Sequence, residues 1–139
     1  MSIPPIVTNF FEQLKIAQLD PAVGIRIVKV TGDDHTGLYV AELKPHCSVT
    51  AHYHKNGGEI YQIVHGKGTI HTGILSGNDL ITWNRSVELK SGDCFTVKEG
   101  EVHQLENTGL EPMVACFVCP AAHIGNDRFI VRGIVPKIS

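Results

Sequence analysis

The 139-residue sequence lacks an apolar run long enough to span a membrane, and it lacks a block of charge of either sign. Its 12 basic and 14 acidic residues give a net charge of −2, so no basic patch is expected that would attract nucleic acid or an anionic membrane surface. The amino terminus has no basic start followed by an apolar stretch. We therefore expect a soluble, cytoplasmic protein with no nucleic-acid or membrane partner.

Cysteine is scarce, with four residues in the chain. Cys116 and Cys119 have CXXC spacing, but they lie in an apolar, strand-like run, where side chains three apart point to opposite faces. Since a second CXXC pair is missing, a four-thiolate zinc site is not expected. Buried, reduced thiols are the main expectation, and the alternative is that one thiol lines the interior near a metal site.

The chain pattern predicts one short helix followed by strands. Residues 8–19 have a capping Thr8 or Asn9 and an apolar stripe of Phe10, Leu14 and Ala17, which favours a helix that covers one end of the fold. Short runs rich in β-branched residues follow, separated by turn residues. The expected strands are residues 25–30, 38–43, 48–54, 59–64, 68–75, 94–97, 102–106, 113–119 and 129–134, with a less regular segment at 76–90.

Strands this short and closely spaced favour an all-β fold, either a closed barrel or a jelly roll, because closure removes exposed sheet edges. At this length we expect one such domain at residues 25–139, after an N-terminal segment at 1–24 that carries the short helix. A single helix leaves no room for a helix-turn-helix, and no phosphate loop, serine nucleophile motif or carboxylate pair is present.

The most informative stretch is residues 52–59, His-Tyr-His-Lys-Asn-Gly-Gly-Glu. Alternate side chains of a strand share a face, so His52 and His54 project towards a common point. The following Asn and two Gly residues tolerate positive φ, so the chain can turn and bring Glu59 back towards both histidines. One hairpin thus offers three candidate metal ligands.

This hairpin and a later segment resemble the cupin superfamily. The residues that match HXH(X)4E(X)6G of its first motif are His52, His54, Glu59 and Gly66, and those that match G(X)5PXG(X)2H(X)3N, its second, are Gly92, Gly100, His103 and Asn107. Two positions depart from the motifs, because His46 replaces the opening Gly and Lys98 replaces the Pro. The resemblance spans about residues 46–107.

The resemblance implies a cupin double-stranded β-helix, a jelly-roll barrel, with a metal held by His52, His54, Glu59 and His103. Three imidazoles and a carboxylate suit a divalent transition metal such as Fe, Mn, Ni, Zn, Cu or Co. Six-coordinate geometry would leave two positions for a ligand, whereas tetrahedral geometry would close the site. Because the ligands must be deprotonated, metal affinity is expected to fall below about pH 6.5.

Other side chains are weaker candidates for a role at the site. Glu59 could act as a catalytic base, and Tyr61, two residues on, faces the same way and is a second catalytic candidate, with barrel filling as its alternative role. His71 and Gln104 are possible supports for the ligands. His123 is expected at the surface, with a position in a pocket as its alternative. Trp83 and Arg85 could lie at the rim, although packing and solvated surface are the more ordinary roles.

We predict a metal-dependent oxidoreductase of dioxygenase type that acts on a small organic substrate inside the barrel. The alternatives are a metal-dependent isomerase or lyase, a non-catalytic small-molecule or metal-binding cupin, and a barrel whose metal only stabilises the fold. The apolar strand expected at residues 129–134 would offer an edge to a second subunit, and small cupins are often dimers, so a homodimer is the expected assembly.

Overall fold

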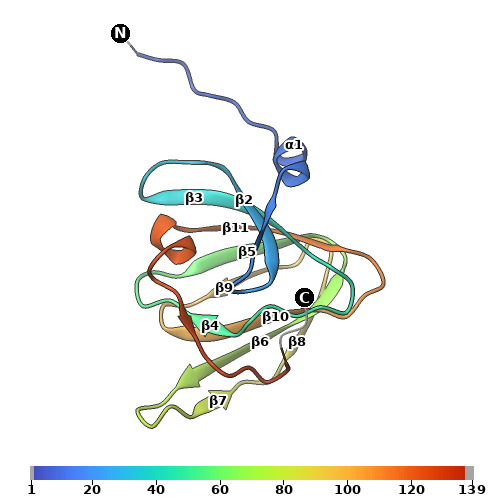
Figure 1. Cartoon of the computed structure of the whole chain (residues 1–139), viewed down its shortest axis with the longest axis vertical. Helices are drawn as coiled ribbons and strands as arrows, with labels where there is room; N and C mark the ends of the chain where they lie inside the picture. Colours follow the sequence, from blue (N-terminus) through green and yellow to red (C-terminus); the bar gives the residue numbers. More distant parts are fainter. Residues whose placement is uncertain (1, 137–139) are drawn as a thin grey trace.

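Two six-stranded antiparallel sheets build the fold of the computed structural model, which describes residues 2–136 (Figure 1). Sheet A has the order β1-β2-β3-β11-β5-β9, and sheet B has the order β12-β4-β10-β6-β7, with β8 paired to β6. The strands of sheet A are β1 (Gln18–Asp20), β2 (Ile25–Gly32), β3 (Thr36–Leu43), β11 (Met113–Pro120), β5 (Glu59–His65) and β9 (Cys94–Val97). Those of sheet B are β12 (Phe129–Ile130), β4 (His52–Tyr53), β10 (Glu101–Asn107), β6 (Lys67–Leu75), β7 (Ile81–Trp83) and β8 (Val87–Lys90). The predicted all-β jelly-roll architecture is confirmed.

The helix α1 (Phe10–Lys15) is shorter than the predicted one at residues 8–19. The Asn9 side chain caps it by accepting the backbone N–H groups of Phe11 and Glu12. The prediction was wrong at the C-terminal end because residues 18–20 join sheet A as β1. Phe10 and Leu14 pack on the outer face of sheet A against Val30, Val40 and Val114, so α1 covers a sheet face.

Apolar side chains fill the space between the sheets in two clusters. The larger contains Leu43, Ile63, Ile70, Leu105 and Met113, and the smaller contains Tyr39, Ala41, Phe117 and Cys119. Each fully buried side chain of the size of Ile63 contributes about 1.5–3 kcal/mol to folding. The candidate site lies between these clusters, because both contribute residues to the cavity beside it.

The backbone at the two positions that depart from the cupin motifs, His46 and Lys98, shows how each replacement is accommodated. Gly66 and Gly100 of the motifs have φ of 100° and 76°, the left-handed region that glycine tolerates. His46, which replaces a motif glycine, also has a positive φ of 59°, so the histidine accepts a conformation that is unusual for it. Lys98, which replaces the motif proline, donates its N–H to Oε1 of Glu101 at 3.2 Å, a bond that proline could not make.

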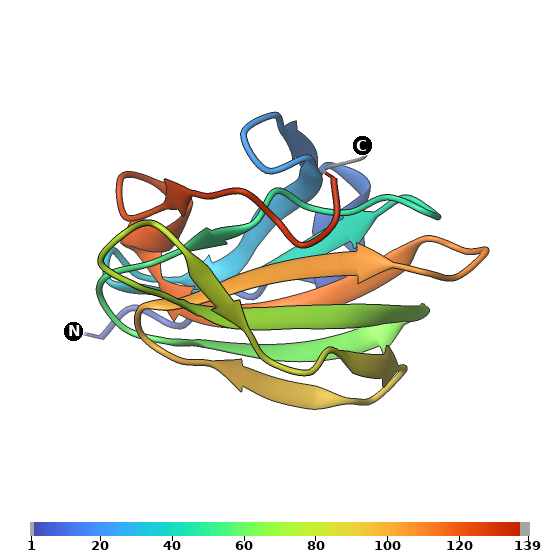
Figure 2. The same ribbon diagram turned by 90° about the horizontal axis from the view of Figure 1, so that it is seen from below.

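Two predicted strands are much shorter than expected. The strand predicted at residues 48–54 is reduced to β4, and the one predicted at 129–134 is reduced to β12, which pairs with β4. The next residues, in red in Figure 2, continue past the start of β4, where the N–H of Val131 donates to the carbonyl oxygen of Ala51 at 3.0 Å. They are held by Gln104, which donates to the carbonyl oxygen of Val135 at 2.9 Å and accepts the N–H of Ile134 at 3.1 Å. These side-chain bonds replace the strand ladder that the apolar sequence suggested.

All four cysteines are free thiols. Cys47 and Cys119 are buried as predicted, but Cys116 is half-buried and Cys94 is exposed, so the expectation of buried thiols was wrong for these two. Cys116 and Cys119 do occupy opposite faces of β11, since Cys119 packs in the inner cluster and Cys116 lies by Gln62 of the neighbouring strand.

No helix in the described part of the chain is both long enough and apolar enough to cross a membrane.

Candidate metal centre

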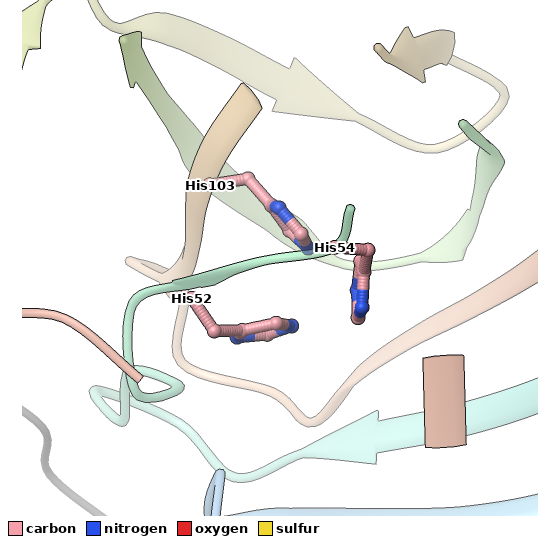
Figure 3. Close-up of side chains that lie close together, drawn as sticks. All are labelled: His52, His54 and His103. Atoms are coloured by element: carbon pink, nitrogen blue, oxygen red, sulfur yellow. The ribbon is translucent and has the colours of Figure 1, made fainter. Parts of the chain in front are cut away.

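Three histidines meet on the inner face of sheet B. β4 pairs with β10 in a register that places His52 directly opposite His103, and His54 follows on the same side of the chain as His52. All three side chains are buried, and their candidate ligand atoms lie within 4.8 Å of one another. Figure 3 shows the three rings pointing into a common space. The structure thus brings together all three histidines that the sequence analysis selected.

Glu59 reaches the same space from β5. Gly57, with φ of 80°, forms the turn between the histidines and this strand, as the sequence suggested. Oε1 of Glu59 contacts Nε2 of His54 and lies 3.8 Å from Nε2 of His103. With His54 and His123, Glu59 forms a second group whose ligand atoms are within 4.8 Å of one another.

His123 was expected at the surface, and this prediction was wrong. Its side chain is fully buried in η1 (Ala121–Ile124), where its ring stacks on His54 with a centroid distance of 3.8 Å. Nδ1 lies 3.2 Å from Oε1 of Glu59, and Nε2 lies 2.6 Å from the carbonyl oxygen of Asn56. The apolar neighbours in the sequence, Ala-Ala before it and Ile after it, are the one local sign of burial.

The environment sets the charge of each group. Burial lowers the pKa of His52 and of His103, so both rings are neutral at pH 7, the form that binds metals. Burial opposes the charge of Glu59, but its contacts with His123 and His54 outweigh this and lower the pKa of the carboxyl. Burial likewise opposes the charge of His123, yet hydrogen bonds to Glu59 and Asn56 raise the pKa of its ring.

The hydrogen bonds of the three rings leave Nε2 available on each. Nδ1 of His52 lies 2.7 Å from the carbonyl oxygen of Thr50, Nδ1 of His54 lies 2.5 Å from that of Asp127, and Nδ1 of His103 lies 3.3 Å from that of Glu101. Since a carbonyl oxygen only accepts, each Nδ1 carries a proton, and Nε2 of the neutral rings of His52 and His103 keeps a lone pair.

Two of these nitrogens lack an ordinary partner within residues 2–136: Nε2 of His103 is buried without a hydrogen bond, and buried Nε2 of His54 faces only the carboxylate of Glu59. Unpaired buried nitrogens are costly unless something binds them. A metal ion fits this arrangement, because three imidazole lone pairs and a carboxylate converge on one space. The cluster could therefore hold a divalent transition metal.

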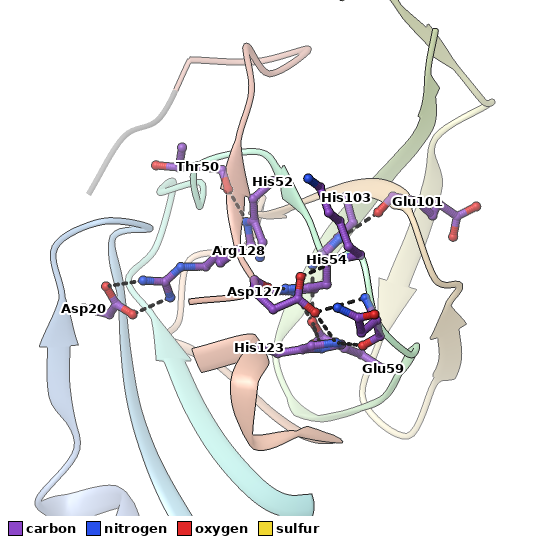
Figure 4. Close-up of polar contacts among 12 residues, drawn as sticks. Asp20, Thr50, His52, His54, Glu59, Glu101, His103, His123, Asp127 and Arg128 are labelled. Carbon is purple, nitrogen blue, oxygen red and sulfur yellow. Dashed lines mark hydrogen bonds and ion pairs between the residues drawn. The ribbon is translucent and has the colours of Figure 1, made fainter. Parts of the chain in front are cut away.

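Asp127 fixes the hairpin that carries the ligands, as Figure 4 shows. Its carboxylate accepts the N–H of Lys55 at 2.8 Å and the N–H of Asn56 at 3.0 Å, while its carbonyl accepts from His54. Burial opposes the charge of Asp127, but the hydrogen bonds from Lys55 and Asn56 lower the pKa of its carboxyl. Asp127 could not be identified from the sequence, because its partners lie more than 70 residues away and its own loop has no periodicity.

A cavity of about 50 Å³ adjoins the cluster. Its walls are mostly apolar and include Val23, Ile25, Ile27, Val49, Ile70 and Phe117. Tyr61 also lines it, with its ring stacked between Phe95 and Phe117 at centroid distances of 5.0 and 5.1 Å. Burial and the charge of Glu59 raise the pKa of Tyr61 well above its usual value, so its hydroxyl stays protonated as a donor. Tyr61 thus fills the barrel interior beside Glu59, and its catalytic role stays a prediction.

His71 and Gln104 lie on the outer face of sheet B, away from the cluster. Alternation along β10 turns Gln104 outwards where His103 points inwards, and His71 is the register partner of Gln104 on β6. His71 bonds to Ser86 at 2.6 Å and to Glu106 at 3.0 Å. The suggestion that these two residues support the ligands was wrong. Trp83 and Arg85 do not line the cavity either.

Residues 39–119 match the model of a protein family described as the cupin domain. A curated relative, the oxalate-binding protein of Thermotoga maritima, is 42% identical over 69 residues, which make up 49% of this chain and 48% of the relative. The chain therefore spans about half the length of this relative.

Solved structures share the fold. An uncharacterized conserved protein with a double-stranded β-helix domain from Klebsiella pneumoniae has a TM-score of 0.66 at 20% identity, covering 94% of this chain and 100% of its own. A predicted oxalate decarboxylase from Thermotoga maritima has a TM-score of 0.55 at 23% identity, covering 77% and 81%. At these identities the likeness establishes a common fold.

Proposed function

The chain belongs to the cupin domain family, and from this premise we propose that it binds a divalent transition metal and a small organic ligand side by side inside the barrel. The proposed metal ligands are Nε2 of His52, His54 and His103 and the carboxylate of Glu59. The observation that carries the proposal is the convergence of three buried Nε2 atoms and the Glu59 carboxylate on one space, on rings whose Nδ1 atoms all face carbonyl oxygens, with Nε2 of His103 left without a hydrogen bond.

The size and chemistry of the cavity support a ligand of few heavy atoms. Its volume of about 50 Å³ is several times the roughly 10–15 Å³ that one water molecule needs. It is far below the roughly 300–1,000 Å³ of pockets for drug-sized ligands. The hydroxyl of Tyr61, which hydrogen-bonds to Glu59, borders the space for such a ligand, and the other walls are mostly apolar. The curated relative is named for binding oxalate, a ligand of this size.

The enzymatic form of the proposal is an oxidoreductase of dioxygenase type. A bound redox-active metal would supply the activation of dioxygen or the polarisation of a ligand oxygen. The histidines hold their lone pairs at Nε2, Glu59 balances part of the positive charge, and Tyr61 orients the ligand. The same groups serve an isomerase, a lyase or a non-catalytic binding protein, and measurement of turnover separates these classes. We further propose a homodimer in the cytoplasm.

The metal content of the purified protein tests the central claim. Inductively coupled plasma mass spectrometry is expected to find about one transition metal per chain, and the double variant His52→Ala/His54→Ala is expected to lose it while remaining folded by circular dichroism. The control is His35→Ala/His65→Ala, which removes two exposed histidines and should leave the metal in place. Wild-type protein that takes up no metal overturns the proposal, and unfolding of the first variant alone favours a structural metal.

Dioxygen uptake then tests the enzymatic form. Anaerobic protein loaded with Fe(II) is mixed with oxalate or with small diols and diketones, and an oxygen electrode records consumption after air is admitted. Uptake that depends on one of these compounds and is lost in His52→Ala/His54→Ala supports the dioxygenase type. Tight ligand binding without uptake assigns the site to binding, isomerisation or elimination.

A further inference from the structure

A single arginine lines the cavity beside the metal cluster. Arg128 is the only lysine or arginine of the described chain in this wall, and its side chain is 14% exposed. Figure 4 places it between Asp20 and the histidines. Its neighbours in the wall include Val23, Ile25 and Ile124, so a cation lies in an apolar environment, where it is costly unless it meets an anion.

Asp20 fixes the position of this guanidinium. Its two carboxylate oxygens accept from Nη1 and Nη2 of Arg128 at 2.6 and 3.4 Å, and Asp20 is itself held in a turn, where Oδ1 accepts the N–H of Ala22. A guanidinium has five N–H donors. Two of them bond to Asp20, and the structure gives the others no acceptor in residues 2–136. Arg128 is therefore oriented and still has donors to offer.

We infer that the ligand in the cavity is a small dicarboxylate, and that Arg128, positioned by Asp20, binds the carboxylate oxygens that the metal leaves free. This inference rests on the proposed function, because it requires a metal at the histidine cluster. The planar guanidinium matches a carboxylate in shape and charge. A divalent ion and Glu59 leave one positive charge, and the Arg128–Asp20 pair is neutral, so the charges favour an anionic ligand, while the free N–H donors of Arg128 favour a second carboxylate on it. An anionic ligand therefore offsets a charge that the apolar walls would otherwise leave uncompensated.

Isothermal titration calorimetry on the Mn(II)-loaded protein tests this assignment with two ligands of nearly equal size. Oxalate carries two carboxylates, and oxamate carries an amide in place of one. Wild type is expected to bind oxalate at least tenfold more tightly than oxamate. Arg128→Gln is expected to lower the affinity for oxalate about tenfold or more, so that oxalate is no longer preferred over oxamate. The control is Arg132→Gln, which removes an exposed arginine that does not line this cavity and should change neither affinity.

The outcomes separate the inference from the proposed function. Oxalate affinity in Arg128→Gln equal to that in Arg132→Gln overturns the role of Arg128 and leaves the metal site standing. Mn(II)-loaded wild type that binds neither compound overturns the proposed ligand and the inference with it. If Arg128→Gln does not fold, Asp20→Asn decides, because it loosens the guanidinium without removing it. An unchanged preference for oxalate in Asp20→Asn overturns the inference, and a preference reduced severalfold supports it.

Discussion

The hairpin at residues 52–59 and the segment at residues 121–128 lie against each other at the candidate metal cluster, but they contribute to it in different ways. The hairpin supplies ligand atoms through strand alternation and one turn, which are local properties of the chain. The later segment supplies acceptors instead: the carbonyl of Asp127 receives the Nδ1 proton of His54, and its carboxylate caps two N–H groups of the turn. We conclude that local geometry sets which atoms can bind a metal, whereas distant contacts set their tautomer and orientation.

Among substitutions that leave the candidate ligands intact, the largest loss of metal affinity is expected when the support from residues 121–128 is weakened. Asp127→Asn replaces one acceptor by an amide donor that faces the N–H of Lys55 or Asn56, so the turn loses part of its support. Metal affinity, measured by competition with a chromogenic chelator, is expected to fall about 10–100-fold even though every ligand is intact. The control is Asp93→Asn, because Asp93 accepts the N–H of Lys90 in a turn that contributes no residue to the cluster. Equal affinities in the two variants would contradict the role given to Asp127.

The same comparison explains which site residues could be predicted from the sequence. The ligand residues could be selected because their relation depends on period-two alternation, one glycine turn and motif spacing. His123, Asp127 and Arg128 could not, because their partners Glu59, Lys55 and Asp20 are 64, 72 and 108 positions away. The segment that carries them has neither a strand nor a helical period. The strand predicted at 129–134 failed for a related reason, since apolar composition cannot reveal that Gln104 would bind this backbone.

An effect of intermediate size is expected on the stability of the metal-free protein as the pH changes. Burial lowers the pKa of His52 and His103, so below the ordinary value of 6.5 the unfolded chain binds protons that the folded one does not, and stability falls as the pH decreases. His123 acts in the opposite sense: its raised pKa contributes stability below pH 6.5 that is lost as the pH rises through the raised value. Each group contributes on the order of 1 kcal/mol per unit of difference.

Urea denaturation of the metal-free protein between pH 5 and pH 8 measures these contributions. Wild type is expected to lose stability on acidification, His52→Gln to lose less, and His123→Gln to lose more. The three profiles would have the same slope if the histidines titrated alike when folded and unfolded. The lowered pKa values also imply that the loaded protein keeps its metal to a lower pH than the value of about 6.5 that free histidine suggests.

The smallest effect is expected on the outer face of sheet B. His71 is the register partner of Gln104, next to the cluster residue His103, but its ring bonds to Ser86 and Glu106 on the opposite face. His71→Ala should therefore leave metal affinity within about twofold of wild type, and should lower the free energy of unfolding by about 1 kcal/mol through the lost hydrogen bonds. Chelator competition and thermal denaturation measure the two quantities. A tenfold loss of metal affinity would mean that contacts on the outer face of sheet B orient His103 through β10. The outer face of this strand would then have to be counted with residues 121–128 as support for the ligands.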